Sequence, residues 1–150
     1  MDEYEKLSNH IVLSACKDLR RLMKELSEHQ AAMEYIDNRL DKIKKSEIPG
    51  KDFNRLHTLR CIIERDIKTI SKNIKEIERF LLSPFGMMLS YGNGADIFNS
   101  IKSEPVKCSF GKNKRKFFQK KEKELYHLNQ MKEYKRTYYF KHKKPNEHIE

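Results

Sequence analysis

Apolar residues recur at intervals of three and four over much of the first 82 positions, and this spacing is the strongest constraint on the fold. The first series is interrupted by a single histidine. Its members are Leu19, Leu22, Leu26, His29, Met33, Ile36, Leu40 and Ile43. Such a pattern is typical of a long helix packed along another helix. The sequence therefore predicts one helix over about 3–45.

Two features of this predicted helix leave alternatives open. His29 occupies an apolar position, either as a polar residue that fixes the register or as a pH-sensitive or ligand-binding group. Near the N-terminus, Tyr4, Leu7 and Ile11 extend the stripe, but its phase shifts before Leu19. We therefore expect a stutter or gentle kink at this point.

A second apolar series with the same spacing follows a turn. Pro49-Gly50 ends one helix, and Asp52 is a residue type that caps the next. The members of the second series are Phe53, Leu56, Leu59, Ile63, Ile67, Ile70, Ile74, Ile77 and Leu81. Two such helices joined by a short turn predict an antiparallel, coiled-coil-like helical hairpin over 1–83.

Folding the chain about this turn leaves residues 3–15 beyond the end of the second helix. Either residues 84–101 fold back over them, or a second copy of the chain covers them in a homodimer. Residues 84–105 are rich in glycine, methionine and aromatic side chains. They are predicted to form an irregular capping segment with one short helix, capped by Asp96 and ended before Pro105.

The net charge of +10 lies almost entirely in the last third of the chain. Residues 1–100 carry 17 basic and 16 acidic side chains, whereas residues 101–150 carry 15 and 6. This asymmetry is typical of an anion-binding region on a near-neutral scaffold, although a solubilising tail is the alternative. Residues 106–150 are predicted as a basic, aromatic-rich helical region with a short β element near 106–110 and a third helix over about 113–137. The predicted fold class is mainly α.

Basic and aromatic side chains alternate in this region, a composition that suits nucleic acid. Lysine and arginine neutralise phosphates, and exposed rings stack on unpaired bases. No helix-turn-helix, zinc-finger or RNA-recognition signature is visible, which favours single-stranded or structured nucleic acid over a sequence-specific duplex. The candidate nucleic-acid-binding residues are Lys112, Lys114, Arg115, Lys116, Phe117, Lys120, Lys121, Lys135, Arg136, Tyr138, Tyr139, Lys141, Lys143 and Lys144.

Several classes of protein are not expected. The six histidines are scattered, and there is no carboxylate cluster, GxSxG motif or phosphate loop, so we predict no enzyme, cofactor or metal site. No apolar stretch reaches the roughly 18 residues of a membrane span. The acidic N-terminus does not resemble a secretory signal, and the three cysteines do not form a disulfide framework. We expect an intracellular location, in the cytoplasm or a host-cell cytoplasm.

These observations predict a small, basic, helical accessory protein that binds nucleic acid or a nucleoprotein complex electrostatically through its C-terminal third. The alternative is a protein-binding adaptor or inhibitor that docks on a larger nucleic-acid-processing enzyme. The abundance of lysine, isoleucine and asparagine is typical of an AT-rich genome and would suit a mobile element. A purely structural coiled-coil oligomer is the third hypothesis.

Overall fold

The regular elements of the described residues are all helices, so the predicted mainly α fold class is confirmed. The computed structural model describes the backbone of residues 2–45 and 51–142 and the side chains of residues 2–45 and 52–132. The helices are α1 (Glu3–Lys45), α2 (Lys51–Leu82), α3 (Pro84–Leu89), α4 (Gly94–Lys102) and α5 (Phe110–His142). They divide into two compact units, Met1–Lys112 and Asn113–Glu150, here called unit 1 and unit 2.

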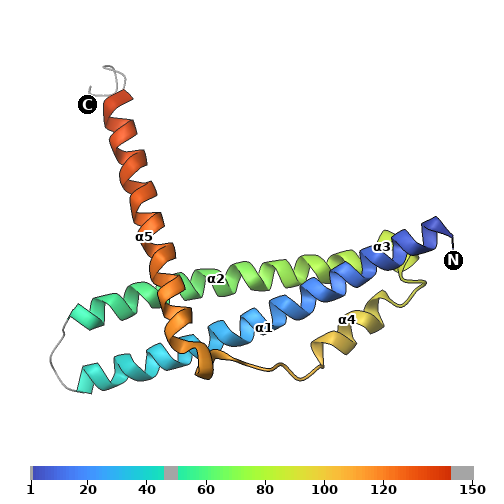
Figure 1. Ribbon diagram of the computed structural model, residues 1–150, viewed down its shortest axis with the longest axis horizontal. Helices are drawn as coiled ribbons and strands as arrows, with labels where there is room; N and C mark the ends of the chain where they lie inside the picture. The colour runs from blue at the N-terminus through green and yellow to red at the C-terminus, as the bar shows by residue number, and fades with distance from the viewer. Residues whose placement is uncertain (1, 46–50, 143–150) are drawn as a thin grey trace. The chain divides into compact units, whose positions relative to one another are not determined.

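In unit 1, α1 and α2 lie side by side and run in opposite directions (Figure 1). Arg60 of α2 donates to the carboxylate of Asp37 on α1 at 2.8 Å. The buried apolar side chains of both helices come largely from the two predicted series. Those of α1 include Leu19, Leu22, Ile36 and Leu40, and those of α2 are Leu59, Ile62, Ile63, Ile70, Ile74 and Leu81. The coiled-coil character of this pair stays a prediction.

The stripe expected near the N-terminus of α1 is wrong. Tyr4 and Leu7 are more than half exposed, and of the three predicted residues Ile11 alone packs, partly buried, against the core; Ser8, Val12 and Cys16 are buried instead. These three residues, with Leu19, continue the spacing of four and three without interruption, so α1 stays in phase over its whole length. Desolvation by burial raises the pKa of the Cys16 thiol, as expected for a packing residue.

The segment after α2 folds back over this part of α1, as one of the two predicted alternatives requires. Leu89 of α3 and Phe98 and Ile101 of α4 join Val12 and Cys16 in one apolar core. The segment contains two short helices rather than the single one expected. Asp96 lies in the first turn of α4, and Asn93 occupies the N-cap position. Ser83 caps α3, where its hydroxyl oxygen accepts from the amide of Gly86 at 3.0 Å.

Two glycines set how closely α3 and α4 approach the end of α2. A Cβ at Gly86 would collide with the carbonyl oxygen of Phe80, and one at Gly94 with that of Leu81. Both obstacles are backbone atoms, which do not move aside as a flexible side chain can. Only glycine therefore permits this packing of α3 and α4 against α2.

The predicted β element at 106–110 is wrong, and the reason is its neighbour. Residues 105–109 follow α4 without regular structure and run along α1 (Figure 1). Arg20 donates to Glu104 at 2.9 Å, Ser109 donates to Glu28 at 2.6 Å, and the Phe110 ring lies edge-on to Tyr35 at 6.1 Å. The six residues from Glu104 to Phe110 span about 21 Å when extended. This is close to the roughly 22 Å that the fifteen helical residues from Arg20 to Tyr35 span. We call residues 104–110 the strap. It lies along a helix, whose backbone groups are already hydrogen-bonded to one another and cannot pair with a strand, so no β-strand forms there.

The third helix starts and ends outside the range expected from the sequence. It begins at Phe110 and continues to His142, with a non-helical backbone at Asn113 (φ −114°, ψ 18°). The two compact units meet at this break. The first turn of α5 thus belongs to unit 1, where Phe110 is buried.

Gly86→Ala tests the close approach of α3 to α2. We expect the clash with the Phe80 carbonyl to cost about 3 kcal/mol of folding free energy, which lowers Tm by about 6–12 °C. Gly111→Ala is the matched control, because an added Cβ there meets nothing within 4 Å. It should leave Tm unchanged or raise it slightly. Equal Tm values for the two variants, measured by circular dichroism, would contradict the packing described here.

The strap predicts a pH-dependent contribution to stability from Glu104. The hydrogen bond from Arg20 lowers the pKa of this carboxyl below its ordinary value. The ion pair therefore stabilises the fold above the ordinary carboxyl pKa, and its contribution is lost as pH falls through the lowered value. The Tm difference between the native protein and Glu104→Gln should be present at pH 7 and should vanish in acid. A difference that is the same at both pH values would show that the ion pair does not stabilise the strap.

Candidate anion-binding surface

The basic side chains of α5 that the structure describes divide between two sides of the helix. Phe117, Phe118, Lys121 and Leu125 recur at intervals of three and four on one side. The rings of Phe117 and Phe118 meet edge to face, with centroids 5.7 Å apart. The ammonium of Lys121 lies 5.5 Å above the Phe117 ring and 3.6 Å from the Glu124 carboxylate. The charge of Lys121 is therefore partly neutralised within α5, and Phe117 already has two neighbours.

The other side of α5 carries exposed cations in a row. Lys116, Lys120 and Lys123 are spaced by four and three, with Arg115 beside them. Four helical residues span about 6 Å and three about 4.5 Å, both shorter than the Debye length of about 8 Å at physiological salt. The fields of these side chains therefore add. We call these four residues the α5 basic row.

The α5 basic row carries uncompensated charge. Among the described residues, no carboxylate lies within 4.0 Å of its lysine or arginine nitrogens, although Glu122 and Glu124 flank Lys123. No acidic residue occurs between Glu104 and Glu122 in the sequence. The row thus presents hydrogen-bond donors and positive charge to solvent, which are the requirements for binding a phosphate.

The candidate residues from the sequence are placed unequally by the structure. Arg115, Lys116 and Lys120 come together in the α5 basic row. Lys112 is exposed in the first turn of α5, within unit 1, and Lys114 lies half-buried beyond the break at Asn113. Five further candidates lie on the C-terminal part of α5, of which only the backbone is described; they are Lys135, Arg136, Tyr138, Tyr139 and Lys141. Lys143 and Lys144 lie outside the described residues.

Two residues next to these candidates were missed. Lys123 completes the row, and its spacing of three and seven from Lys120 and Lys116 was available in the sequence. Tyr126 is 60% exposed, three residues after Lys123, and its hydroxyl oxygen accepts from Gln130 at 2.6 Å. An exposed ring held beside cations is suited to stacking on an unpaired base, the role that the sequence analysis gave to Phe117.

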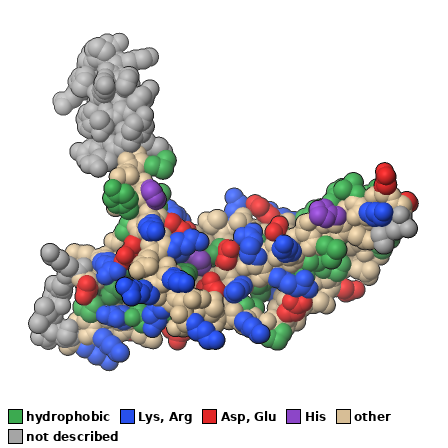
Figure 2. All heavy atoms as spheres, in the orientation of Figure 1, with side chains coloured by type: hydrophobic (Ala, Val, Ile, Leu, Met, Phe, Trp, Pro, Cys, Tyr) green, Lys and Arg blue, Asp and Glu red, His purple; other side chains and the backbone are tan. Residues whose placement is uncertain are grey.

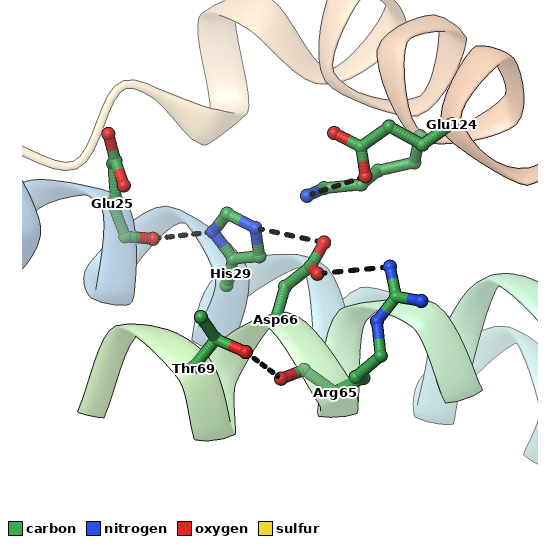
Figure 3. Close-up of polar contacts among 7 residues, drawn as sticks. Glu25, His29, Arg65, Asp66, Thr69 and Glu124 are labelled. Carbon is green, nitrogen blue, oxygen red and sulfur yellow. Dashed lines mark hydrogen bonds and ion pairs between the residues drawn. The ribbon is translucent and has the colours of Figure 1, made fainter. Parts of the chain in front are cut away.

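His29 lies in the interface between α1 and α2, where only 7% of it is exposed. Its Nδ1 is 2.7 Å from the carbonyl oxygen of Glu25, and its Nε2 is 4.0 Å from the Asp66 carboxylate (Figure 3). Asp66 also lies 3.5 Å from the Arg65 guanidinium on the same helix. The imidazole therefore meets polar groups of both helices, which fits a residue that holds their alignment.

Other kinds of site are absent from the part of the chain that the structure describes. No three or more histidine, cysteine, aspartate or glutamate side chains gather there in a way that could hold a metal ion. None of the helices described there is both long and apolar enough to cross a membrane. Comparison with protein-family models, curated proteins and solved structures finds no match to this chain.

Proposed function

We propose that this protein binds nucleic acid through phosphate contacts made by the α5 basic row. The observation that carries the proposal is the alignment of Lys116, Lys120 and Lys123 on one side of α5, with the exposed Arg115 next to Lys116 in sequence and no carboxylate partner for any of the four among the described residues. Release of counterions from the phosphate backbone drives such binding and makes it depend steeply on salt. The protein would act as a basic accessory factor and not as an enzyme.

Single-stranded or structured nucleic acid is the proposed ligand class. The row spans about 12 Å along the helix, long enough to meet successive phosphates of one strand. Tyr126 offers a ring to an unpaired base, and such stacking tolerates any sequence. Phosphate contacts alone carry no sequence information, so we expect weak discrimination between sequences.

A second candidate function rests on exposed apolar side chains around α3. Leu82, Phe85, Met88 and Tyr91 are each about half exposed or more and follow one another at intervals of three. Large apolar side chains that gather on a surface are typical of protein-binding sites. This α3 apolar patch is where an adaptor or inhibitor would hold a nucleic-acid-processing enzyme.

Neutralising the α5 basic row tests the first proposal. The full-length variant Arg115→Gln, Lys116→Gln, Lys120→Gln, Lys123→Gln should lose affinity for a labelled 20-nucleotide single strand. Because four phosphate contacts are removed, the slope of log K against log salt should flatten by about 3. Fluorescence polarisation between 50 and 300 mM salt measures both quantities.

The matched control removes four exposed lysines that lie at least seven residues apart on α1: Lys6→Gln, Lys17→Gln, Lys24→Gln, Lys42→Gln. It has the same net charge as the α5 variant but leaves the row intact. Equal binding by the two variants would show that total charge, and not the α5 basic row, attracts the strand.

The pair Phe85→Ser, Met88→Ser tests the second candidate. Affinity capture after nuclease treatment should recover one stoichiometric protein with the native chain and with the α5 variant, but not with this pair. Recovery of that protein by the serine pair would exclude the α3 apolar patch as its docking surface. Both side chains are half exposed, so we expect the pair to keep the native Tm.

A further inference from the structure

The outward side of α2 carries a second row of cations. Lys68, Lys72, Lys75 and Arg79 are spaced by four, three and four, so they share one side of the helix. All four are exposed, whereas Ile70 and Ile74, which face the other way, are buried against α1. We call these four residues the α2 basic row.

The row borders a shallow groove of about 380 Å³. The groove is lined by the four cations together with Ile67 and Ser71, all from α2. The aliphatic stems of the four cations and Ile67 supply most of the groove's surface, while the four cationic groups and the Ser71 hydroxyl supply hydrogen-bond donors and no carboxylate lines it. A lining of this kind favours an anion.

The α2 basic row differs from the arginines that hold unit 1 together. Arg20 and Arg60 lie 2.9 Å and 2.8 Å from the carboxylates of Glu104 and Asp37 on other elements, and Arg21 lies 3.1 Å from Glu25 on the same helix. Such pairing fits the intermingled basic and acidic side chains along α1 and α2 in Figure 2.

In contrast, no carboxylate among the described residues lies within 4.0 Å of the charged nitrogens of the α2 basic row. Glu76 and Glu78 lie in sequence between Lys75 and Arg79 but pair with none of the four cations, and neither lines the groove.

The spacing of the row concentrates its field. Neighbouring members are about 4.5–6 Å apart along the helix axis, within the Debye length of about 8 Å. Like charges at such spacing destabilise a helix in the free protein, and a bound polyanion relieves the repulsion. The row is about 16 Å long, which is enough to meet several phosphates of one strand.

We propose that the α2 basic row is a second binding site for the phosphate backbone of nucleic acid, separate from α5. Its ligand is a nucleic acid rather than a lipid surface, because a helix that lies on a membrane needs apolar side chains beside its cations. On α2 the apolar side chains are mostly turned into the core of unit 1. This site goes beyond the proposed function of α5 and does not depend on it.

The test neutralises the row in the full-length protein by Lys68→Gln, Lys72→Gln, Lys75→Gln, Arg79→Gln. The same four changes are also made in the α5 variant, and the α1 variant is again the charge-matched control. Binding of the labelled 20-nucleotide strand is followed by polarisation at several salt concentrations. We expect about a tenfold loss of affinity at 50 mM salt beyond that of the α1 variant, and a salt slope flatter by about 3. Tm should not fall, because removing like charges does not weaken the helix.

The four variants, compared with the native protein, separate the two sites. Loss of binding in the α2 variant alone, with none in the α5 variant, supports this inference and overturns the α5 proposal. Loss in the α5 variant alone does the opposite. If the α2 variant binds like the α1 control, the row is an ordinary solvated face and the inference is wrong. It is equally wrong if the native protein binds vesicles of anionic phospholipid, loses that binding in the α2 variant, and binds no nucleic acid.

Discussion

The difference in length between the two long helices governs the architecture of unit 1. α1 has 43 residues and α2 has 32, so about 16 Å of α1 extends past its partner. Buried side chains continue into that extension, at Ser8 and Val12, and would otherwise face water. α3 and α4 supply the missing partner, and they approach closely enough only because Gly86 and Gly94 lack a Cβ. The strap of residues 104–110 then continues along α1 from Arg20 to Tyr35.

Sequence periodicity predicted the parts of this arrangement that depend on one helix at a time. The bounds of α1 and the buried faces of both long helices follow from apolar spacing. The stripe through Tyr4 and Leu7 was wrong because it followed apolar residues whose phase differs from that of Leu19, whereas helical phase selects Ser8, Val12 and Cys16. The strand expected at 106–110 and the single helix expected in 84–105 failed for another reason. Both depend on which surface of α1 or α2 lies alongside, and local sequence does not contain that information.

The candidate site was predictable in the same partial way. Counting charges located the basic third of the chain. The net charge of a whole region, however, does not reveal two features that depend on helical spacing. Lys123 is surrounded in sequence by Glu122 and Glu124, and the α2 basic row lies in a region whose charges nearly cancel. A net charge sums over all directions, whereas a ligand meets only one side of a helix. Structure adds the distinction between cations that pair with a carboxylate, such as Arg20 and Arg60, and those that do not.

Rows of unpaired cations set a limit on what this protein can recognise. Phosphate contacts give affinity and fast association but do not distinguish one sequence from another. Each row contains one arginine, but neither row shows the pattern of a motif known to read base edges in a DNA groove, such as a helix-turn-helix or a zinc finger. Selectivity must therefore come from another surface of the molecule. In the proposed function, Tyr126 would favour unpaired over paired bases, and the α3 apolar patch would offer a contact that does not weaken as salt rises. The two candidate functions use different residues of the chain, so we expect substitutions in the basic rows and in the α3 apolar patch to affect them separately.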